Sequence, residues 1–186
     1  EVRIKRRLLR EEAHLRLGAE PLGAKAKMGF LPQEPTLYPY LTGDEYLAFM
    51  SKIRGDRDIA RALAICDLGP ASRRLTREYS YGMQKRLAFA GAVMGKPGAV
   101  LLDEIFAGLD PLSAARFADH LRKERDRGAA VLMSGHELMM VAELADRVVA
   151  LVQGKHVRTF LKDELESMRK EAGALERAFA ELAAPK

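Results

Sequence analysis

The sequence predicts an α/β fold in which a parallel β-sheet is flanked by helices. From Ala99 onward, short apolar runs alternate with segments of helical periodicity, which is typical of parallel βα units. Between Gly29 and Ala99 the periodicity is mostly helical, so a helical insert is expected there. The chain has 186 residues, 48% of them hydrophobic, which is enough for the core of one domain.

Six elements are expected in the C-terminal half, each bounded by turn or capping residues. The predicted helix after the first strand has Asp110 as N-cap, Pro111 in its first position and Gly128 after its end. The six are strands at Ala99–Leu102 and Ala129–Met133, helices at Pro111–Arg127 and Glu137–Ala145, and a hairpin of Val148–Val152 with Lys155–Phe160.

Three helices are expected in the insert. Thr42 and Glu45 have the spacing of a capping box ahead of a helix at Tyr46–Ile53. The second helix is predicted at Asp58–Asp67, and the third begins at Ser80. Ahead of the insert, Gly29–Leu31 is predicted as a short strand.

One long helix is expected at the C-terminal end, because apolar residues recur there in alternate steps of four and three. They are Leu161, Leu165, Met168, Ala172, Leu175, Phe179 and Leu182. Since only about three heptads are present, packing on the same domain is favoured over an intermolecular coiled coil.

The composition excludes several classes of protein. The single cysteine, Cys66, cannot form an internal disulfide, so a disulfide-stapled scaffold is excluded and a reducing compartment is favoured. The longest run of apolar residues and glycine, Leu87–Gly95, is about half of the roughly 20 residues that a transmembrane helix needs. We therefore do not expect this chain to cross a membrane by itself, and its first residues show no secretory signal pattern.

The net charge of +5 comes mainly from one segment. Residues 1–27 hold eight Lys and Arg against four Glu, and the remainder is nearly neutral. A basic segment can bind nucleic acid or an anionic membrane. Because acidic residues are interleaved with the basic ones, a solvated surface segment is favoured, and no nucleic-acid partner is expected.

Two adjacent carboxylates, Asp103 and Glu104, follow the predicted strand Ala99–Leu102. Open α/β sheets bind ligands at the carboxyl ends of their strands, where Asp103 can hold Mg²⁺ and Glu104 can face an attacking water. Taken alone, the pair is equally consistent with two solvated acids at a turn. His136 follows the next predicted strand, so it is expected at the same edge, within reach of a phosphate oxygen.

Ser80 and Gly82 stand at the start of the third helix of the insert. Free backbone N–H groups and the helix dipole favour an anion there, and a glycine lets it approach closely. An ordinary N-cap serine is the alternative and is the commoner case. Gln33, at the end of GFLPQ, adds a polar amide after the first predicted strand.

In this order, these segments resemble the nucleotide-binding domain of ABC transporters. Residues 29–33 (GFLPQ) resemble the Q-loop, 79–86 (YSYGMQKR) the signature motif, and 99–104 (AVLLDE) the Walker B strand with its catalytic glutamate. Residues 107–111 (AGLDP) resemble the D-loop, 134–137 (SGHE) the switch histidine loop, and 175–182 (LERAFAEL) the last helix of efflux-type members. The resemblance implies a P-loop NTPase-like sheet with the family's helical insert.

The sequence departs from the family pattern in four ways. Tyr81 replaces glycine and Met83 replaces glutamine in the signature, and Ile105 replaces the proline after the catalytic glutamate. No Walker A motif, G-x-x-x-x-G-K-(S/T), occurs; residues 91–97 (GAVMGKP) have the wrong spacing and end in proline. In the family the P-loop precedes the Q-loop, so the chain is expected to be a domain truncated ahead of Glu1, lacking the P-loop and the first strands.

The expected organisation is therefore one incomplete ABC ATPase domain over residues 1–186. A strand and linker occupy 1–33, the insert with the signature 34–97, the core from Walker B to the switch histidine 98–160, and the C-terminal helix 161–186. Residues 1–4 (EVRI) resemble the strand that follows the P-loop helix. A sheet that lacks an interior strand is expected to expose unpaired edges and to aggregate.

The resemblance implies ATP hydrolysis with Mg²⁺ in the complete protein. Glu104 would orient or deprotonate the attacking water, and His136 would stabilise charge on the γ-phosphoryl group. Asp103 and Gln33 would bind Mg²⁺, and Gln33 also belongs to the nucleotide site. The fragment by itself is expected to be inactive.

The resemblance also implies two protein partners. One is a second ABC ATPase domain, identical or different, whose bound ATP would be contacted by Ser80 and Gly82, while Asp110 would link the two sites. The other is a transmembrane permease subunit, docked on residues 34–40 with the exposed-looking Leu37, Tyr38 and Tyr40. The expected location is peripheral, on the cytoplasmic face of the cell membrane.

Two alternatives stay open at this point. The same ATPase module also serves non-transport proteins of translation or DNA maintenance, although those usually carry two modules or inserted coiled coils, which are not visible in this sequence. The other alternative is a catalytically incomplete subunit that completes a composite site with a partner's P-loop.

Overall fold

The computed structural model describes residues 2–5, 23, 25 and 27–183, and the fold is α/β as expected. Its strands are β1 (Val2–Lys5), β2 (Met28–Leu31), β3 (Ala99–Leu102), β4 (Ala130–Gly135), β5 (Arg147–Val152) and β6 (Lys155–Leu161). Its helices are α2 (Gly43–Arg54), α3 (Ile59–Cys66), α4 (Tyr81–Val93), α5 (Pro111–Asp126), α6 (Leu138–Leu144), α7 (Lys162–Met168) and α8 (Ala174–Ala183). Two 3₁₀ turns, η1 (Gly69–Arg73) and η2 (Thr76–Glu78), precede α4.

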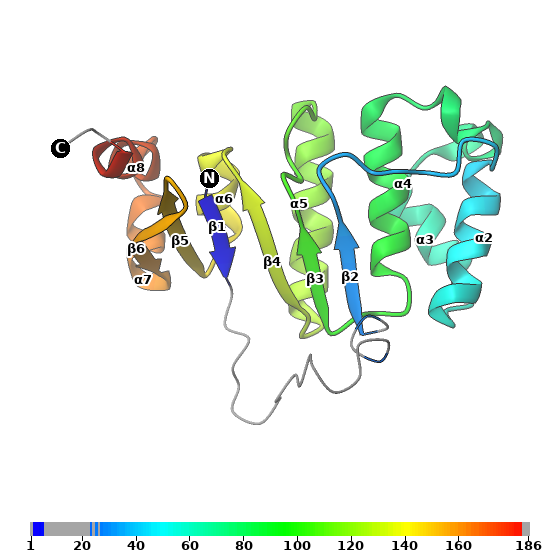
Figure 1. Cartoon of the computed structure of the whole chain (residues 1–186), viewed down its shortest axis with the longest axis horizontal. Helices are drawn as coiled ribbons and strands as arrows, with labels where there is room; N and C mark the ends of the chain where they lie inside the picture. The colour runs from blue at the N-terminus through cyan, green and yellow to red at the C-terminus, as the bar shows by residue number, and fades with distance from the viewer. Residues whose placement is uncertain (1, 6–22, 24, 26, 184–186) are drawn as a thin grey trace.

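The strands form one sheet in the order β2-β3-β4-β1-β5-β6 (Figure 1). Strands β2, β3 and β4 are parallel and in register, with Leu31 beside Leu102 and Leu102 beside Met133. Their carboxyl ends therefore lie at the same edge of the sheet, which is where the predicted site residues follow them.

The expected gap inside the sheet is not observed. Strand β1 lies between β4 and β5 and pairs antiparallel with both, with Val2 beside Gly135 on one side and Ala150 on the other. The prediction of unpaired interior edges was wrong for the described residues, because β1 supplies backbone partners to both neighbours. The predicted strand at residues 1–4 is confirmed as far as it is described, since Glu1 and residues 6–22 lie outside the described ranges.

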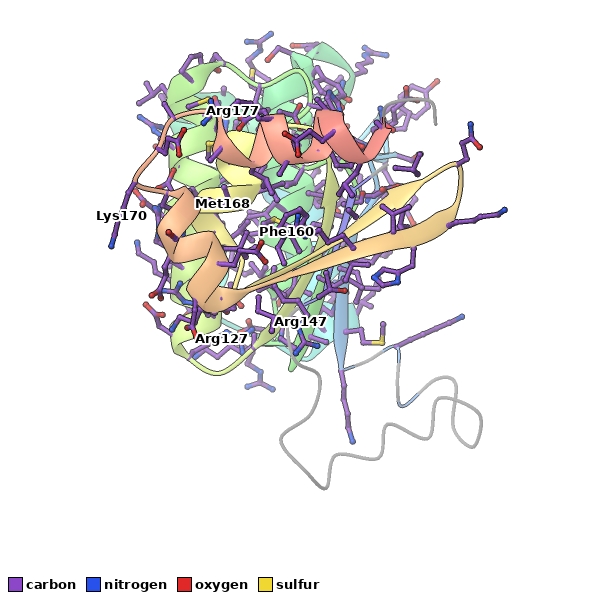
Figure 2. The ribbon with its side chains drawn as sticks, turned by 90° about the vertical axis from the view of Figure 1, so that its left-hand side faces the viewer. Arg127, Arg147, Phe160, Met168, Lys170 and Arg177 are labelled. Carbon is purple, nitrogen blue, oxygen red and sulfur yellow. The ribbon has the colours of Figure 1, made fainter. Side chains whose placement is uncertain are left out.

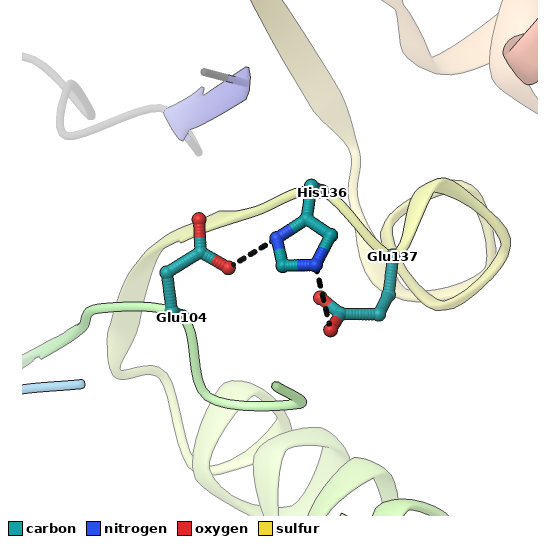
Figure 3. A group of neighbouring side chains, drawn as sticks. All are labelled: Glu104, His136 and Glu137. Atoms are coloured by element: carbon teal, nitrogen blue, oxygen red, sulfur yellow. Dashed lines mark hydrogen bonds and ion pairs between the residues drawn. The ribbon is translucent and has the colours of Figure 1, made fainter. Parts of the chain in front are cut away.

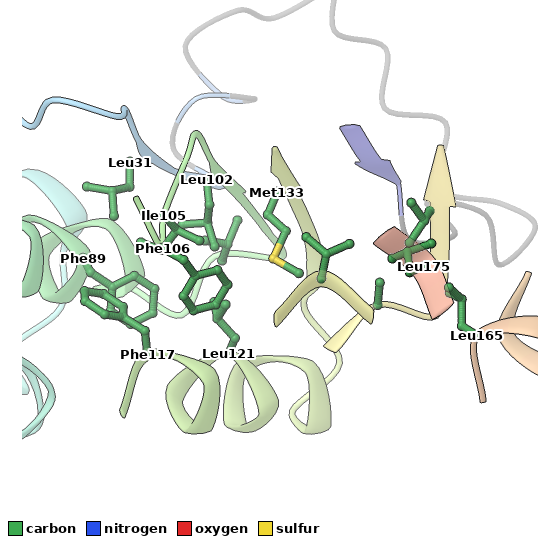
Figure 4. Packing of buried hydrophobic residues seen from close by; sticks show 14 of the residues in the cluster. Leu31, Phe89, Leu102, Ile105, Phe106, Phe117, Leu121, Met133, Leu165 and Leu175 are labelled. Atoms are coloured by element: carbon green, nitrogen blue, oxygen red, sulfur yellow. The ribbon is translucent and has the colours of Figure 1, made fainter. Parts of the chain in front are cut away.

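The main core forms between one face of the sheet and the helices α4, α5 and α6 (Figures 1 and 4). Leu31, Leu102 and Met133 contribute buried side chains from three strands. The rings of Phe89 and Phe117 meet edge to face at 5.2 Å between centroids. Burial of each such side chain is worth about 1.5–3 kcal/mol, so this face holds the strands against the helices.

The helical insert has a second core of its own between α2, α3 and α4, around Leu47, Ala62 and Leu87. The predicted capping box begins α2: the Glu45 N–H donates to Thr42 Oγ1 over 3.2 Å, and the Thr42 N–H donates to Glu45 Oε2 over 2.8 Å. Helix α2 begins three residues earlier than predicted because the capping box places its first turn at Gly43. The other strands and helices predicted up to residue 160 are observed, and each predicted boundary lies within about two residues of the observed one.

The single long helix predicted at the C-terminal end was wrong. The chain forms α7 and α8, separated by a turn in which Gly173 has a φ of 73°, a left-handed conformation that interrupts the helix. Packing on the same domain is nevertheless confirmed, because Leu165 and Leu175 are fully buried with Phe160 of β6. Figure 2 shows α7 and α8 beside the β5–β6 hairpin, with Phe160 of β6 next to both helices. In the part of the chain that is described, no helix is long and apolar enough to cross a bilayer.

Candidate functional site

The candidate site lies at the carboxyl ends of the parallel strands. Asp103 and Glu104 directly follow β3, and His136 directly follows β4. The Asp103 N–H donates to the Leu31 carbonyl over 2.9 Å, so the end of β2, from which Gln33 follows, lies at the same edge. The structure thus brings together the Q-loop, Walker B and switch histidine segments that were predicted separately.

Glu104 and His136 are in direct contact across this edge (Figure 3). Oε2 of Glu104 lies 2.8 Å from Nδ1 of His136, and Nε2 of His136 lies 3.4 Å from Oε1 of Glu137. The His136 side chain is 70% exposed, whereas Glu104 is 17% exposed. A partly buried carboxylate bonded to an open imidazole can take up or direct a proton at the solvent side of the site.

Ser134 is a site residue that the sequence reasoning missed. Its hydroxyl donates to Oδ1 of Asp103 and accepts the Glu104 N–H over 3.1 Å. One side chain therefore orients both acidic residues from the neighbouring strand. The available signal was its position two residues ahead of His136, directly after the predicted strand Ala129–Met133.

Glu104 has a strained backbone, with a φ of 49°. A non-glycine residue in the left-handed region costs on the order of 1–3 kcal/mol and persists where its surroundings hold it. Below it lies Lys85 of α4, which is fully buried and which the sequence reasoning also missed. Burial lowers the pKa of Lys85, while the carboxylates of Glu137 and Glu104 act against that shift.

Ser80 and Gly82 stand at the N-terminus of α4, as predicted. The Ser80 Oγ accepts the Met83 N–H over 3.4 Å, which makes Ser80 the N-cap. A Cβ added to Gly82 would meet only the Leu109 side chain, at 3.9 Å. The space above Gly82 is therefore open, so the chain's own packing does not demand a glycine there, whereas the close approach of an anion would.

Tyr81 joins the signature helix to the Q-loop segment. Its hydroxyl donates to the main-chain carbonyl of Gln33 over 2.8 Å, and the Gln33 residue is exposed. Burial raises the pKa of Tyr81, and the nearby charge of Glu34 acts in the same direction. The aromatic residue that replaces the family's glycine thus has a definite structural contact.

Asp110 acts as the N-cap of α5, as predicted. Its carboxylate accepts the Ser113 N–H over 2.9 Å and the Ser113 hydroxyl over 2.6 Å. These bonds, first of all the one from the hydroxyl, lower the pKa of Asp110. Its predicted role between two nucleotide sites is not addressed by these contacts and stays a prediction.

The oxygen ligands at this edge fit a hard divalent cation. Asp103 is exposed and its carboxylate offers the oxygen ligands that Mg²⁺ prefers. Oε2 of Glu137 is buried and has no hydrogen-bond donor among the described residues. An unsatisfied buried carboxylate oxygen is unfavourable, so binding of a hydrogen-bond donor or a cation beside Glu137 would stabilise the site.

The chain belongs to the ABC transporter family. A protein-family model described as ABC transporter matches residues 7–107, more than half of the chain. This confirms the resemblance inferred from the order of the motifs. The three relatives described next are named as ATP-binding proteins.

Three bacterial proteins are among the curated relatives. The uncharacterized ABC transporter ATP-binding protein YthP of Bacillus subtilis is 32% identical over 77% of this chain and 62% of its own length. The bacitracin transport ATP-binding protein BcrA of Enterococcus faecalis is 31% identical over 75% and 47%. The linearmycin resistance ATP-binding protein LnrL of Bacillus subtilis is 30% identical over 80% and 50%. The chain thus spans about half to three-fifths of the length of the curated relatives it matches.

A solved structure, described as the structure of an ATP binding subunit of an ABC transporter, has the same fold. It aligns with a TM-score of 0.77 over 91% of this chain and 73% of that one, at 23% identity. At this identity the likeness concerns the fold alone, and the P-loop NTPase-like parallel sheet with a helical insert is confirmed.

Proposed function

We propose that this chain belongs to the ATP-binding subunit of an ABC transporter, which couples ATP binding and hydrolysis to substrate transport through a membrane partner. The observation that carries the proposal is the contact between Glu104 and His136 at the sheet edge, 2.8 Å long, beside the exposed carboxylate of Asp103. The family membership supports the same reaction class.

In this proposal the residues at the sheet edge act on the γ-phosphate of ATP. Glu104 orients or deprotonates the attacking water, and His136 donates a hydrogen bond to the charge that develops on the phosphoryl oxygens. Asp103 and Gln33 hold Mg²⁺, which when bound neutralises charge on the phosphates. Ser134 keeps Asp103 and Glu104 in their relative orientation through the two bonds that it makes.

Ser80 and Gly82 act on a second nucleotide, bound to another ABC ATPase domain. The exposed N-terminus of α4 and the open space above Gly82 support this role, because both suit an anion supplied from outside the chain. Asp110 lies in the D-loop segment between the catalytic edge and α5, where it transmits changes from one site to the other.

The transmembrane permease subunit docks in a groove beside the Q-loop segment. The groove has a volume of about 440 Å³ and is lined by residues of segment 34–39, by Arg77 and by Tyr81 and Gln84 of α4. Tyr38 and Tyr40 next to it are 53% and 76% exposed, whereas Leu37 is partly buried against the core. The expected exposure was right for the tyrosines and wrong for Leu37. Docking here places the protein peripherally, on the cytoplasmic face of the membrane.

The 186 residues contain no Walker A motif, so the chain alone is proposed not to turn over ATP. The test measures binding of labelled ATP and release of phosphate with the purified chain, alone and mixed with an ABC ATP-binding protein that carries an intact P-loop. We expect turnover only in the mixture, and in the protein completed with its own P-loop we expect Glu104→Gln to abolish turnover. Rapid hydrolysis by the chain alone would contradict the proposal.

The missing motif also supports a second candidate, in which the chain is a naturally incomplete subunit that completes a composite site. The two candidates differ in the coding sequence ahead of Glu1. An in-frame G-x-x-x-x-G-K-(S/T) there supports a complete ATPase, and its absence together with turnover in the mixture supports the composite site.

A further inference from the structure

Lys85 is a fully buried charge on the helix that begins at the signature motif. Its ammonium donates to three main-chain carbonyls, those of Glu104 over 2.8 Å, Ile105 over 3.1 Å and Ala107 over 2.9 Å. A lysine ammonium has three donors, so all of them are used. Because burying an unpaired ammonium is very unfavourable, this side chain is fixed only while the loop keeps these carbonyls in place.

The loop that Lys85 holds begins with Glu104, whose backbone is anchored from both sides. The Glu104 N–H donates to Ser134 Oγ over 3.1 Å, and its carbonyl accepts from Lys85 and from the Ala107 N–H, the latter over 3.2 Å. These bonds link the residue to β4 on one side and to α4 on the other. They hold the strained φ of 49° that aims the carboxylate at His136.

Tyr81 extends this contact toward the Q-loop. Its ring centroid lies 4.9 Å from the Lys85 ammonium, within the range of a cation–π interaction, and its hydroxyl donates to the Gln33 carbonyl. The ring also lies against Gly108, where a Cβ would come within 3.1 Å of it. Through Tyr81 and Lys85, one turn of α4 therefore contacts the Q-loop segment, the loop of residues 104–107 and the D-loop segment at Gly108.

We propose that Lys85 is a positioning residue for Glu104. It couples the loop of residues 104–107 to the helix that presents Ser80 and Gly82, so that the carboxylate keeps its contact with His136 and follows movements of this helix. Lys85 acts through the backbone and touches neither nucleotide nor water. Its effect on turnover rests on the proposed ATPase function, whereas its effect on the loop does not.

The first test measures amide hydrogen exchange in the full chain, which needs no nucleotide. In Lys85→Met, which keeps the length of the side chain but removes its donors, we expect the amides of Ala107 and Leu109 to exchange about tenfold faster or more. The amides of β3 and of α3 should change much less. The matched control is Arg86→Met on the same helix, because Arg86 donates to the Asp67 carbonyl and does not contact the loop.

Wild-type protection of the loop amides in Lys85→Met would overturn the proposal, as would an equal acceleration in Arg86→Met. Where Lys85→Met does not fold, Tyr81→Leu serves as a second variant, since it removes the ring beside the ammonium on a side chain that is already 37% exposed. It should accelerate the same two amides by about twofold to threefold, with any further change confined to the Q-loop segment, whose Gln33 carbonyl loses the Tyr81 hydroxyl. Unchanged exchange in that variant would overturn the proposal.

The second test measures turnover of the protein completed with its own P-loop, so that the nucleotide lies at the sheet edge that carries Glu104. We expect Lys85→Met to lower kcat about tenfold or more with KM for ATP within about twofold, and Lys85→Arg to recover part of that loss. A rise in KM at constant kcat would overturn the positioning role. If the completed wild-type protein shows no turnover, the proposed function fails, and hydrogen exchange still decides whether Lys85 fixes the Glu104 loop.

Discussion

Glu104 and His136 form a hydrogen bond of 2.8 Å between residues that follow adjacent parallel strands. The carboxylate is mostly buried and the imidazole is mostly exposed, so the pair points from the core toward solvent. Nε2 of His136 also lies 3.4 Å from Oε1 of Glu137, which places the imidazole between two carboxylates. Under the proposed function, Glu104 accepts the proton of a water and His136 contacts the phosphoryl group.

Replacing Glu104 with glutamine removes the negative charge and keeps the shape of the side chain. In the protein completed with its own P-loop, we expect turnover to fall by about a hundredfold or more, because the amide cannot accept the proton of the attacking water. ATP-dependent association of the two domains should persist, as shown by size-exclusion chromatography with ATP. Hydrolysis by Glu104→Gln at the wild-type rate would contradict the assignment of Glu104 as the general base.

Replacing His136 with alanine removes the imidazole but leaves the loop of Glu104 in place. We expect kcat to fall by about tenfold to a hundredfold, since one hydrogen bond to the developing charge is lost. The control is His156→Ala, because His156 is exposed on β6 and bonds only locally, to Thr159 over 3.0 Å. Equal losses of kcat in both variants would refute a specific role for His136.

The elements with strong local patterns were predictable from the sequence. The strand Ala99–Leu102 was correct at both ends, and the Asp110 and Ser80 caps were found where the sequence placed them. The C-terminal heptad pattern was misleading, because it reports which side chains are apolar and not whether the backbone continues. Helix α7 ends at Met168 and α8 begins at Ala174, directly after Gly173 with its left-handed φ, and the apolar residues of both helices still reach the same core.

The candidate site was predictable only as far as its residues are chemically distinctive. Asp103, Glu104 and His136 were found because acids and a histidine after apolar strands are conspicuous. Ser134 and Lys85 were missed, since their roles depend on contacts across 30 and 19 residues of sequence, respectively. Lys85 stands between Gln84 and Arg86, so no local pattern marks it as buried.

The position of β1 could not be predicted from composition. Pairing between β1 and β4 joins residues more than a hundred positions apart, and its antiparallel direction follows from tertiary structure.

Asp56 gives a prediction for the pH dependence of stability. Its carboxylate accepts the Gly95 N–H over 2.7 Å, the Asp58 N–H over 2.9 Å and a donor of Arg61 over 3.2 Å, and the first of these contributes most to lowering its pKa below the usual 3.8. Since the folded pKa lies below the unfolded one, the stabilisation is complete above the unfolded pKa and is lost as the pH falls through the folded pKa.

We therefore expect Asp56→Asn to lower the free energy of unfolding by about 1–3 kcal/mol at neutral pH, measured by urea titration of the purified chain. The difference from wild type should shrink as the pH falls below about 4, because protonated Asp56 resembles the amide. Asp119→Asn is the control, since Asp119 is 66% exposed and pairs only with Arg122 on the same helix. A difference that stays constant with pH would contradict the role of the Asp56 charge.

Phe117 tests whether the contact between α4 and α5 carries the stability of the core. The side chain is 2% exposed and meets Phe89 edge to face, so Phe117→Ala leaves a cavity beside β3. We expect a loss of about 3–5 kcal/mol in the free energy of unfolding by urea titration.

Leu112→Ala on the same helix is the control, because Leu112 is 64% exposed and its loss should cost no more than about 0.5 kcal/mol. Alanine favours helix formation more than phenylalanine does, so a loss confined to Phe117→Ala comes from packing and not from the helix itself. Equal losses in the two variants would show that α5 is not held through this core.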